Sequence, residues 1–378
     1  MSPVTQYIFD GTKWQNEVAT ARRTVAATTT TTATTTRKTG AKYVRYEDVY
    51  VSGDSLQKTI DRVTGNRVLT FPEGVFVIPP NFANGYQDGI RLGHAGWGSG
   101  CRGISGSGRN TIFKMLSSNR SQVTSGVNTY MLIDAVPRGA DPMISVEFSN
   151  FRIQGTKLGA DHDHNGLRLE RCTNSLIENL YITGIRGSNK VPPGETGSIS
   201  LQHCTNITVN NTEMDGRRDG VRVSSSLLMP NNSSGIHVND CYFHHTYTGG
   251  GGIAWYYTTD GEVNNTRSEY IGSGPGQLQG YSFNHEESTR ITYRNPVMVC
   301  DRNTVGGTLH MSLNSVGSGN PDCVLTVYNP KWDATKVGGG KFCVETWTVN
   351  GQVQRTPPKV YGADNSTPLP FYYINPYI

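Results

Sequence analysis

Two aspartates on either side of a basic run are the first candidates for catalysis. Asp215 and Asp219 enclose Gly216-Arg217-Arg218, and Glu286 is a further acidic candidate on a later segment. Hydrolysis of a glycosidic bond uses two carboxyl groups, about 5 to 9.5 Å apart, of which one acts as an acid. The neighbouring guanidinium groups favour ionised carboxylates, which suits a base or a nucleophile and not an acid. The sequence identifies no partner carboxyl with a raised pKa, so the catalytic set is incomplete.

Candidate binding residues occur on short strands that follow a glycine and read apolar–any–apolar. Because alternate residues of a strand face the same side, the outward positions form columns from one repeat to the next. The first column reads Arg168, Ser200, Arg222, Ala254, Ser282 and His310. The second column reads Glu170, Gln202, Ser224, Tyr256, Asn284 and Ser312. Planar hydrogen-bonding groups beside an aromatic ring suit a carbohydrate.

We therefore predict six substrate-binding residues: Arg168, Glu170, Gln202, Arg222, Tyr256 and Asn284. The alternative is an ordinary solvated sheet face.

The string Asp161-His162-Asp163-His164 has the composition of a metal site. Alternate residues of an extended segment share a side, so the string offers either two Asp or two His. No third or fourth ligand can be named for it, and His244-His245 is equally ambiguous. We predict no metal and no other cofactor from the sequence.

These residues are carried by a repeat that runs from about residue 144 onward. An apolar residue, any residue and then Asn or Asp recur at intervals of 25 to 34 residues. The polar member of each copy is Asn150, Asn179, Asn211, Asp240, Asn265, Asn295 or Asn329. A fixed period of this length, with strands at fixed places inside it, indicates a solenoid. The fold class is therefore predicted to be all-β, a right-handed parallel β-helix.

The most regular residues of the repeat are predicted to be architectural. Stacked coils lie about 4.8 Å apart, so equivalent Asn side chains can hydrogen-bond to one another along the axis. Asn also tolerates the left-handed backbone of a sharp corner. Cys172 and Cys204 repeat at an interval of 32 residues, which predicts an inward stack. A disulfide between them is geometrically possible, and reduced thiols are favoured.

Composition excludes several classes of protein. Among 378 residues there are 44 glycines, as expected for a protein rich in corners, and the net charge is only +4. Scattered basic residues argue against a nucleic-acid surface. The seven cysteines are irregularly spaced and match neither a disulfide framework nor a zinc motif. We expect a soluble protein without a signal peptide or a membrane span, because no stretch approaches about 20 apolar residues.

Four segments are predicted along the chain. Residues 1–23, with Tyr7, Phe9 and Trp14, form an anchor segment, for which a disordered tail is the alternative. Residues 24–41 form a Thr-rich linker. Residues 42–348 form the β-helix with its N-terminal cap. Residues 349–378, rich in Pro and aromatic residues, form a C-terminal cap that covers the last coil or contacts another chain.

A capping helix is predicted at the start of the β-helix. Asp54-Ser55-Leu56-Gln57 has the form of a capping box, and Leu56, Ile60 and Val63 follow helical spacing up to Gly65. An open solenoid end exposes core and unpaired backbone, which such a helix can cover.

The order of these features resembles a known superfamily. A helix precedes VLTFPEGVFVI at 68–78 and GISGSGRNTIF at 103–113, followed by the Asn-punctuated repeats. This order resembles the pectate-lyase-like right-handed β-helix superfamily and, more narrowly, bacteriophage tail spikes and minor tail proteins. The resemblance implies a homotrimeric virion protein made in the host cytoplasm. Its N-terminus would join other tail proteins and its body would bind a bacterial surface polysaccharide.

Whether the protein is an enzyme stays open at this point. The Asn-Thr-Asp, Asp-Asp, Gly-His-Gly and Arg-Ile-Lys motifs of pectin hydrolases are absent. Depolymerisation of the bound glycan would add a hydrolase or lyase activity. The alternatives are a free polysaccharide hydrolase or lyase, and a non-enzymatic structural component of the virion.

Overall fold

The protein is described by a computed structural model. The described residues are 6–9, 14–17, 38–78, 87–93, 100–115, 129–137, 141–155, 163–185, 197–218, 221–222, 226–245, 251–271, 283–300, 312–316, 323, 325–333, 343–345, 348–349, 352–353, 359–369 and 372–374. The chain divides into two compact units, Met1–Thr34 and Thr35–Ile378. In the first unit, β1 (Gln6–Phe9) and β2 (Trp14–Glu17) pair antiparallel.

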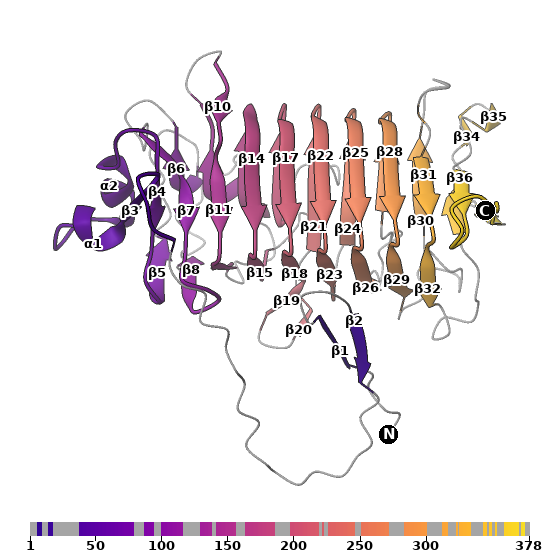
Figure 1. Ribbon diagram of the computed structural model, residues 1–378, viewed down its shortest axis with the longest axis horizontal. Coiled ribbons are helices and arrows are strands. Elements are labelled where there is room, and N and C mark those ends of the chain that lie inside the picture. The colour runs from indigo at the N-terminus through magenta and orange to yellow at the C-terminus, as the bar shows by residue number, and fades with distance from the viewer. Residues whose placement is uncertain are drawn as a thin grey trace, which may run out of the picture. The chain divides into compact units, whose positions relative to one another are not determined.

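The second unit is a parallel β-helix in which successive coils contribute strands to three parallel sheets (Figure 1). The first sheet contains, in order, β3 (Tyr43–Arg45), β4 (Arg67–Thr70), β7 (Cys101–Ser105), β11 (Glu147–Ser149), β14 (Cys172–Glu178), β17 (Thr205–Asn210), β22 (Ser234–Asn239), β25 (Thr259–Asn264), β28 (Thr289–Arg294), β31 (Leu325–Tyr328) and β36 (Lys359–Tyr361), and β10 (Met143–Ile144) also pairs with β14.

The second sheet contains, in order, β5 (Gly74–Ile78), β8 (Thr111–Met115), β12 (Arg152–Gln154), β15 (Tyr181–Thr183), β18 (Glu213–Asp215), β23 (Tyr242–His244), β26 (Arg267–Ile271), β29 (Val297–Cys300) and β32 (Lys331–Asp333). The third sheet contains, in order, β6 (Gln87–Leu92), β9 (Thr129–Ala135), β13 (Asp163–Glu170), β16 (Ile199–Gln202), β21 (Ser226–Asn231), β24 (Gly251–Tyr256), β27 (Phe283–Glu286), β30 (Ser312–Val316), β33 (Cys343–Glu345) and β37 (Tyr372–Ile374). The predicted fold class is confirmed.

The apolar member of the sequence repeat forms a column inside the first sheet. Its residues lie opposite one another on successive strands and are buried: Phe148, Ile177, Val209, Val238, Val263, Tyr293 and Val327. Alternation explains the column, because the residues on either side of each member point away from the core. Burial of this column and of its counterparts on the other sheets provides the main stabilisation of the coils.

The Asn member of the repeat turns the corner between the first and second sheets. Asn150, Asn179, Asn211, Asp240, Asn265, Asn295 and Asn329 all have positive φ, between 43° and 60°. Asn179 and Asn211 each donate a side-chain hydrogen bond to the preceding member of this column, at 3.0 and 2.6 Å. Asn295 and Asn329 continue the same pattern, each at 2.9 Å. The predicted architectural role is confirmed.

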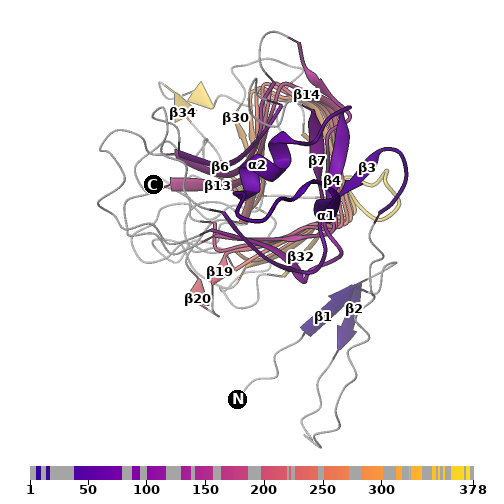
Figure 2. The ribbon, with the colours of Figure 1, turned by 90° about the vertical axis from the view of Figure 1, so that its left-hand side faces the viewer.

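The N-terminal end of the coils is covered by a helix, as predicted. Helix α2 (Leu56–Asp61) lies across the end of the coil in Figure 2, and Leu56, Ile60 and Val63 are buried. The N-cap is Ser55, whose hydroxyl accepts from the Lys58 amide, and not Asp54 as the capping-box pattern suggests. The preceding helix, α1 (Tyr46–Val49), is a single turn.

The cap is also tied to the third sheet by a side-chain amide. Gln57 donates to the Arg91 carbonyl at 2.9 Å and accepts from the Arg91 amide at 2.8 Å. These bonds engage the side chain that the capping box would have used, and they join α2 to β6.

A buried carboxylate holds the segment before β3 against the first sheet. Glu147 accepts from Lys38 Nζ at 2.8 Å and from Lys42 Nζ at 2.9 Å, and Lys38 also bonds Glu178 at 2.6 Å. Burial alone would raise the pKa of Glu147, but the hydrogen bonds from the two lysines lower it to about 2. These ion pairs of Lys38 and Lys42 with Glu147 and Glu178, called the lysine clasp below, join the segment before β3 to β11 and β14.

The two repeated cysteines occupy equivalent positions, at the start of β14 and immediately before β17, and both are free and buried, as expected. Ser233 and Ser288 hold equivalent corner positions in later coils and accept from the amides of Cys204 and Thr258, both at 3.0 Å. The thiol positions therefore belong to a column of small side chains.

The predicted segment boundaries stay predictions, but part of the C-terminal segment extends the solenoid. Strand β36 pairs in parallel with β31, and β37 pairs in parallel with β33. The antiparallel pair of β34 (Thr348–Val349) and β35 (Gln352–Val353) precedes them. Among the described residues, no helix is long and apolar enough to cross a membrane.

Candidate functional site

The outer face of the second sheet carries two in-register rows of polar and aromatic side chains. The middle residues of these strands, such as Ile182, Met214 and Phe243, point into the core. Alternation therefore sends the first and third residues outward. The first positions form the Tyr181 row: Arg152, Tyr181, Glu213, Tyr242 and Arg267. The third positions form the Asp215 row: Gln154, Thr183, Asp215, His244 and Glu269.

The two rows differ in exposure on β15, β18 and β23, whereas Arg267 of the Tyr181 row is buried and Gln154 of the Asp215 row is half-buried. In the Asp215 row, Asp215 and His244 are only 3% and 1% exposed, and Glu269 is also buried. In the Tyr181 row, Tyr181, Glu213 and Tyr242 are half-buried. A ligand at this face would therefore meet the Tyr181 row, while the more buried Asp215 row lies beside that row and fixes its side chains.

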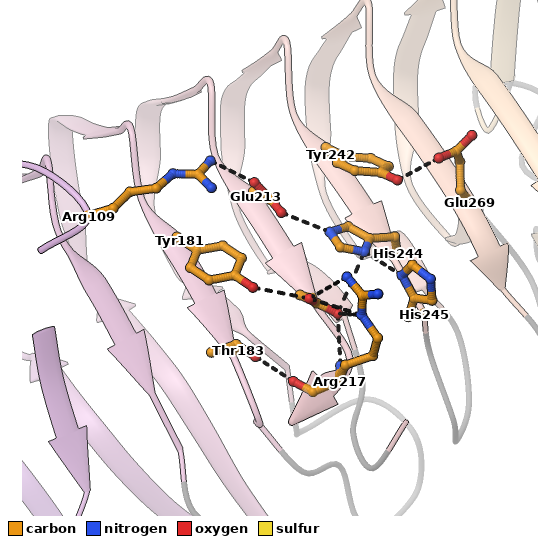
Figure 3. A network of polar contacts seen from close by, with 10 residues as sticks. Arg109, Tyr181, Thr183, Glu213, Arg217, Tyr242, His244, His245 and Glu269 are labelled. Carbon is orange, nitrogen blue, oxygen red and sulfur yellow. Dashed lines mark hydrogen bonds and ion pairs between the residues drawn. The ribbon is translucent and has the colours of Figure 1, made fainter. Parts of the chain in front are cut away.

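Asp215 accepts hydrogen bonds from Tyr181 and Arg217, two of the residues labelled in Figure 3. Arg217 donates from Nε to Oδ1 and from Nη2 to Oδ2, both at 3.0 Å, and its amide donates to Oδ1 at 2.9 Å. The Tyr181 hydroxyl donates to Oδ2 at 3.1 Å. Thr183 bonds the Arg217 carbonyl. Burial, followed by the charge of Asp215, raises the pKa of Tyr181 to about 12, so the hydroxyl stays a donor.

Glu213 lies two residues before Asp215 on the same strand face. Arg109, in the turn before β8, donates to Glu213 Oε2 at 2.6 Å, and His244 Nε2 lies 3.1 Å from Oε1. Burial alone would raise the pKa of Glu213, but the hydrogen bond from His244 and the charge of Arg109 lower it to about 2. This carboxylate is a base, a nucleophile or a hydrogen-bond acceptor, and it is not a general acid at neutral pH.

Strand geometry sets the distance between the two carboxylates. Residues i and i+2 of a strand are separated by about 6.6 Å, which lies within the range that glycosidases use. Asp215 is paired with Arg217 and Glu213 with Arg109. The spacing thus fits glycoside hydrolysis, but the charge environment of Glu213 does not fit the acid role.

The later end of the site is rigid. The Tyr242 ring stacks on the His244 ring at 4.1 Å with an interplanar angle of 19°. The Tyr242 hydroxyl donates to Glu269, which also pairs with Arg267. These contacts hold the Tyr242 ring in one orientation, so a ligand would meet a preorganised surface.

The predicted acids fall on different parts of the fold. Asp215 belongs to the second sheet, and the predicted neighbouring cation is Arg217. Asp219 lies outside the described residues. Glu286 is on β27 of the third sheet, opposite Tyr256. The structure therefore brings Asp215 together with Glu213, which the sequence did not single out, and not with Glu286.

The predicted binding columns are partly wrong in register. Arg222 is on β20 (Val221–Arg222), which pairs antiparallel with β19 (Arg217–Arg218), and is absent from the third sheet. Met229 of β21 takes its place opposite Ser200. Asn284 lies opposite Ala254 and belongs to the first column, while Glu286 takes the predicted place of Asn284 beside Tyr256. A short hairpin before β21 explains the first error, because Val221 and Arg222 pair antiparallel with β19 and not with a strand of the third sheet.

Several outward side chains of the third sheet are already paired or buried, among those that the structure describes. Arg168 makes two bonds to Asp134, at 2.7 and 2.8 Å, and lies 3.9 Å from Glu170. Gln202 is half-buried, whereas Tyr256 is buried with Met229 and Ala254 in a small apolar cluster. Binding roles for Arg168, Glu170, Gln202, Arg222, Tyr256 and Asn284 stay predictions.

The residues that sequence reasoning missed carry a readable signal. Tyr181, Glu213 and Tyr242 each lie two residues after the corner residue of their coil, at the start of a polar–apolar–polar triplet. The outward positions of these triplets form columns in the same way as those of the glycine-led strands, and these columns contain all three residues.

No family model matches the sequence, and no curated protein matches it. Among solved structures, the chain is similar to ORF18 of Geobacillus virus E2 at 11% identity and a TM-score of 0.46, covering 85% of this chain and 58% of that one. It is similar to the DFA-IIIase of Arthrobacter chlorophenolicus A6 at 12% identity and 0.46, covering 87% and 86%. It is also similar to the Dettilon tailspike protein at 11% and 0.45, covering 88% and 68%. The chain thus spans less than two thirds of the Geobacillus virus E2 protein.

Proposed function

We propose that this chain is a tail-spike-type virion protein of a bacteriophage whose β-helix binds a bacterial surface glycan along the Tyr181 row. The observation that carries the proposal is the in-register row itself. Its half-buried side chains, Tyr181, Glu213 and Tyr242, alternate ring and carboxylate along the helix axis. The guanidinium groups of Arg109 and Arg152 lie 4.9 and 5.1 Å from the Tyr181 ring centroid. A sugar would therefore meet a row of planar guanidinium and carboxylate groups with aromatic rings between them, which suits its hydroxyl groups and its apolar C–H face.

The row suits a polymer better than a small molecule. Parallel coils repeat every ~4.8 Å, so the row offers similar groups at regular intervals along a line. A linear glycan also presents its hydroxyl groups at regular intervals. Arg109, whose side chain is mostly exposed, extends the row and donates to Glu213. The Asp215 row fixes the side chains before the ligand arrives, which reduces the entropy cost of binding.

Binding to whole bacteria and to purified surface polysaccharide tests the proposal. We expect Tyr181→Ala and Tyr242→Ala each to weaken binding about tenfold or more, because each removes a ring and a hydroxyl. Tyr257→Asn is the matched control, since Tyr257 is exposed at a corner outside the row and Asn keeps its positive φ. Equal binding by wild type and both row variants would remove this site from consideration.

Glycan hydrolysis is a second candidate, favoured by the separation of Glu213 and Asp215 on one strand face. Production of new reducing ends from the bound polysaccharide would support it, and Glu213→Gln should then reduce turnover far more than it reduces binding. Polysaccharide of unchanged length after prolonged incubation would leave the protein a binding spike.

Assembly is the remaining part of the proposal. We propose a homotrimer in the phage tail, joined to other tail proteins through residues 1–34, which form a separate compact unit. Sedimentation should give a trimer, and a monomer at micromolar concentration would contradict it. Deletion of residues 1–34 should prevent incorporation into virions. If virions retain infectivity without residues 50–348, the protein is a structural component and not the receptor-binding one.

A further inference from the structure

Three potential metal ligands converge at one corner of the second sheet. They are Asp215 at the end of β18, His244 at the end of β23, and His245, the corner residue that follows it. The two Nδ1 atoms are 2.6 Å apart, and His244 Nδ1 lies 3.6 Å from Asp215 Oδ1. One ligand atom from each residue lies within 4.8 Å of the other two. Figure 3 shows the two imidazole rings turned toward each other beside Arg217.

These separations are close to those of a tetrahedral site. Metal–ligand bonds of about 2.0–2.1 Å in tetrahedral geometry place neighbouring ligand atoms about 3.3 Å apart. The observed distances bracket that value, so small side-chain rotations complete the geometry. His245 is at a corner with positive φ, 57°, and is only half-buried, so its ring can make this adjustment.

A carboxylate behind His244 selects the tautomer that a metal requires. Glu213 Oε1 lies 3.1 Å from Nε2 of His244, and Glu213 is also paired with Arg109, so its carboxylate accepts from His244. A neutral His244 therefore carries its proton on Nε2 and directs the Nδ1 lone pair at His245 and Asp215. Carboxylate–histidine–metal arrangements of this kind are a regular feature of metal sites in proteins.

We propose that Asp215, His244 and His245 bind one divalent transition-metal ion, with Glu213 as the residue that orients His244. Two imidazoles and one carboxylate favour Zn²⁺, Co²⁺ or Ni²⁺ over Ca²⁺ or Mg²⁺, which prefer oxygen ligands. In the metal-free protein the short Nδ1–Nδ1 contact is a hydrogen bond whose donor is His245. The ion takes the place of that proton and joins β18 to β23, on adjacent coils.

Arg217 competes with the ion for the same carboxylate. Its guanidinium bonds both oxygens of Asp215 and carries a positive charge into the site. The side chain is 36% exposed on the short hairpin β19–β20, so it can turn toward solvent. Because the guanidinium and the metal ion would share Asp215, removing Arg217 should strengthen metal binding.

Equilibrium dialysis of the untagged full-length protein against ZnCl₂, followed by metal analysis, tests the proposal. We expect one Zn²⁺ per chain at micromolar concentration, and its loss in His245→Asn, which tolerates the positive φ. His237→Asn is the matched control, because His237 is an exposed histidine 3.5 Å from Glu262 on the first sheet. Glu213→Gln should weaken binding about 10- to 100-fold without removing a ligand. Arg217→Gln should tighten it about tenfold, since a repelling charge is lost.

The visible absorption spectrum of the wild-type protein with Co²⁺ tests the proposal without any variant, and so does not depend on whether a variant folds. Co²⁺ bound by these three ligands with one further ligand is four-coordinate and should give intense visible absorption that Zn²⁺ abolishes. No Zn²⁺ bound by the wild type, weak octahedral-type Co²⁺ absorption, or equal binding by folded His245→Asn and wild type would each overturn the proposal. The outcome is independent of glycan binding, which is measured separately in the presence of EDTA.

Discussion

Replacing Asp240 with asparagine should stabilise the protein, because Asp240 interrupts the corner column of asparagines. Each neighbour donates from Nδ2 to the preceding member, and Asn265 donates to Asp240 Oδ1 at 3.2 Å. A carboxylate has no N–H group, so Asp240 cannot donate to Asn211 as Asn211 donates to Asn179. Asp240→Asn supplies the missing donor without changing side-chain size or the positive φ of 54°.

The expected gain follows from the value of one side-chain hydrogen bond. A neutral bond contributes about 0.5–1.5 kcal/mol, and partial exposure of the corner favours the lower half of that range. Unfolding entropy of about 2.1 cal/mol/K per residue, over a unit of this size, converts 1 kcal/mol into a rise of about 1–2 °C in Tm. Calorimetry or urea unfolding resolves such a change.

The control separates the hydrogen bond from the change in net charge. Asp141→Asn removes the same charge at an exposed position away from the column. Asn265→Asp is the converse variant, since it removes a donor and places two carboxylates in contact, and it should destabilise by about 1–2 kcal/mol. If Asp240→Asn gains no more than Asp141→Asn, the column stabilises through backbone geometry alone and the reasoning is refuted.

Three further predictions concern the cap, the lysine clasp and a buried histidine. Ile60→Ala should cost about 2–5 kcal/mol, because a fully buried side chain is lost from the cap, and a cost below 1 kcal/mol by urea unfolding would contradict this. Glu147→Gln should cost on the order of 2 kcal/mol at neutral pH. Because the pKa of Glu147 is lowered to about 2, its contribution is present above pH 4.5 and lost as the pH falls toward 2, and the variant's deficit should vanish in that window. Burial lowers the pKa of His285 to about 4, so its contribution is present above pH 6.5 and declines as the pH falls toward 4. His285→Gln should flatten stability between those values, and an unchanged pH profile would contradict it.

Much of the fold could be predicted because it depends on local chemistry that recurs. Asn150 and Asn179 occupy left-handed corners that few other residues tolerate, and Phe148 and Ile177 repeat the same inward position. The helix at 56–61 was likewise evident from its apolar spacing. Each of these features depends on residues near in sequence or at a constant interval.

The register of the third sheet depends on the short hairpin β19–β20, which lies between two of its strands, β16 and β21, in the sequence. The triplet after Gly220 matches the strand pattern as well as the triplet after Gly166 does, yet its residues Val221 and Arg222 pair with β19 in a hairpin. Two segments match the strand pattern, and only the folded structure shows that β21 pairs with β16 while Arg222 pairs with β19. The local sequence pattern does not distinguish the two segments, so it predicts the wrong column for Arg222.

The amino-acid sequence by itself determined the coil, its corners, its core column and its N-terminal cap, because period-2 alternation and the repeated Asn act locally. Tertiary structure alone decided the chemistry. It brought His244 against Glu213, 31 residues away, and buried Asp215 while leaving Tyr181 half-exposed. The stacking of coils decides which residues meet across coils. Burial by neighbouring side chains decides which of the two outward rows meets solvent. Both are properties of the assembled coils and not of any one repeat.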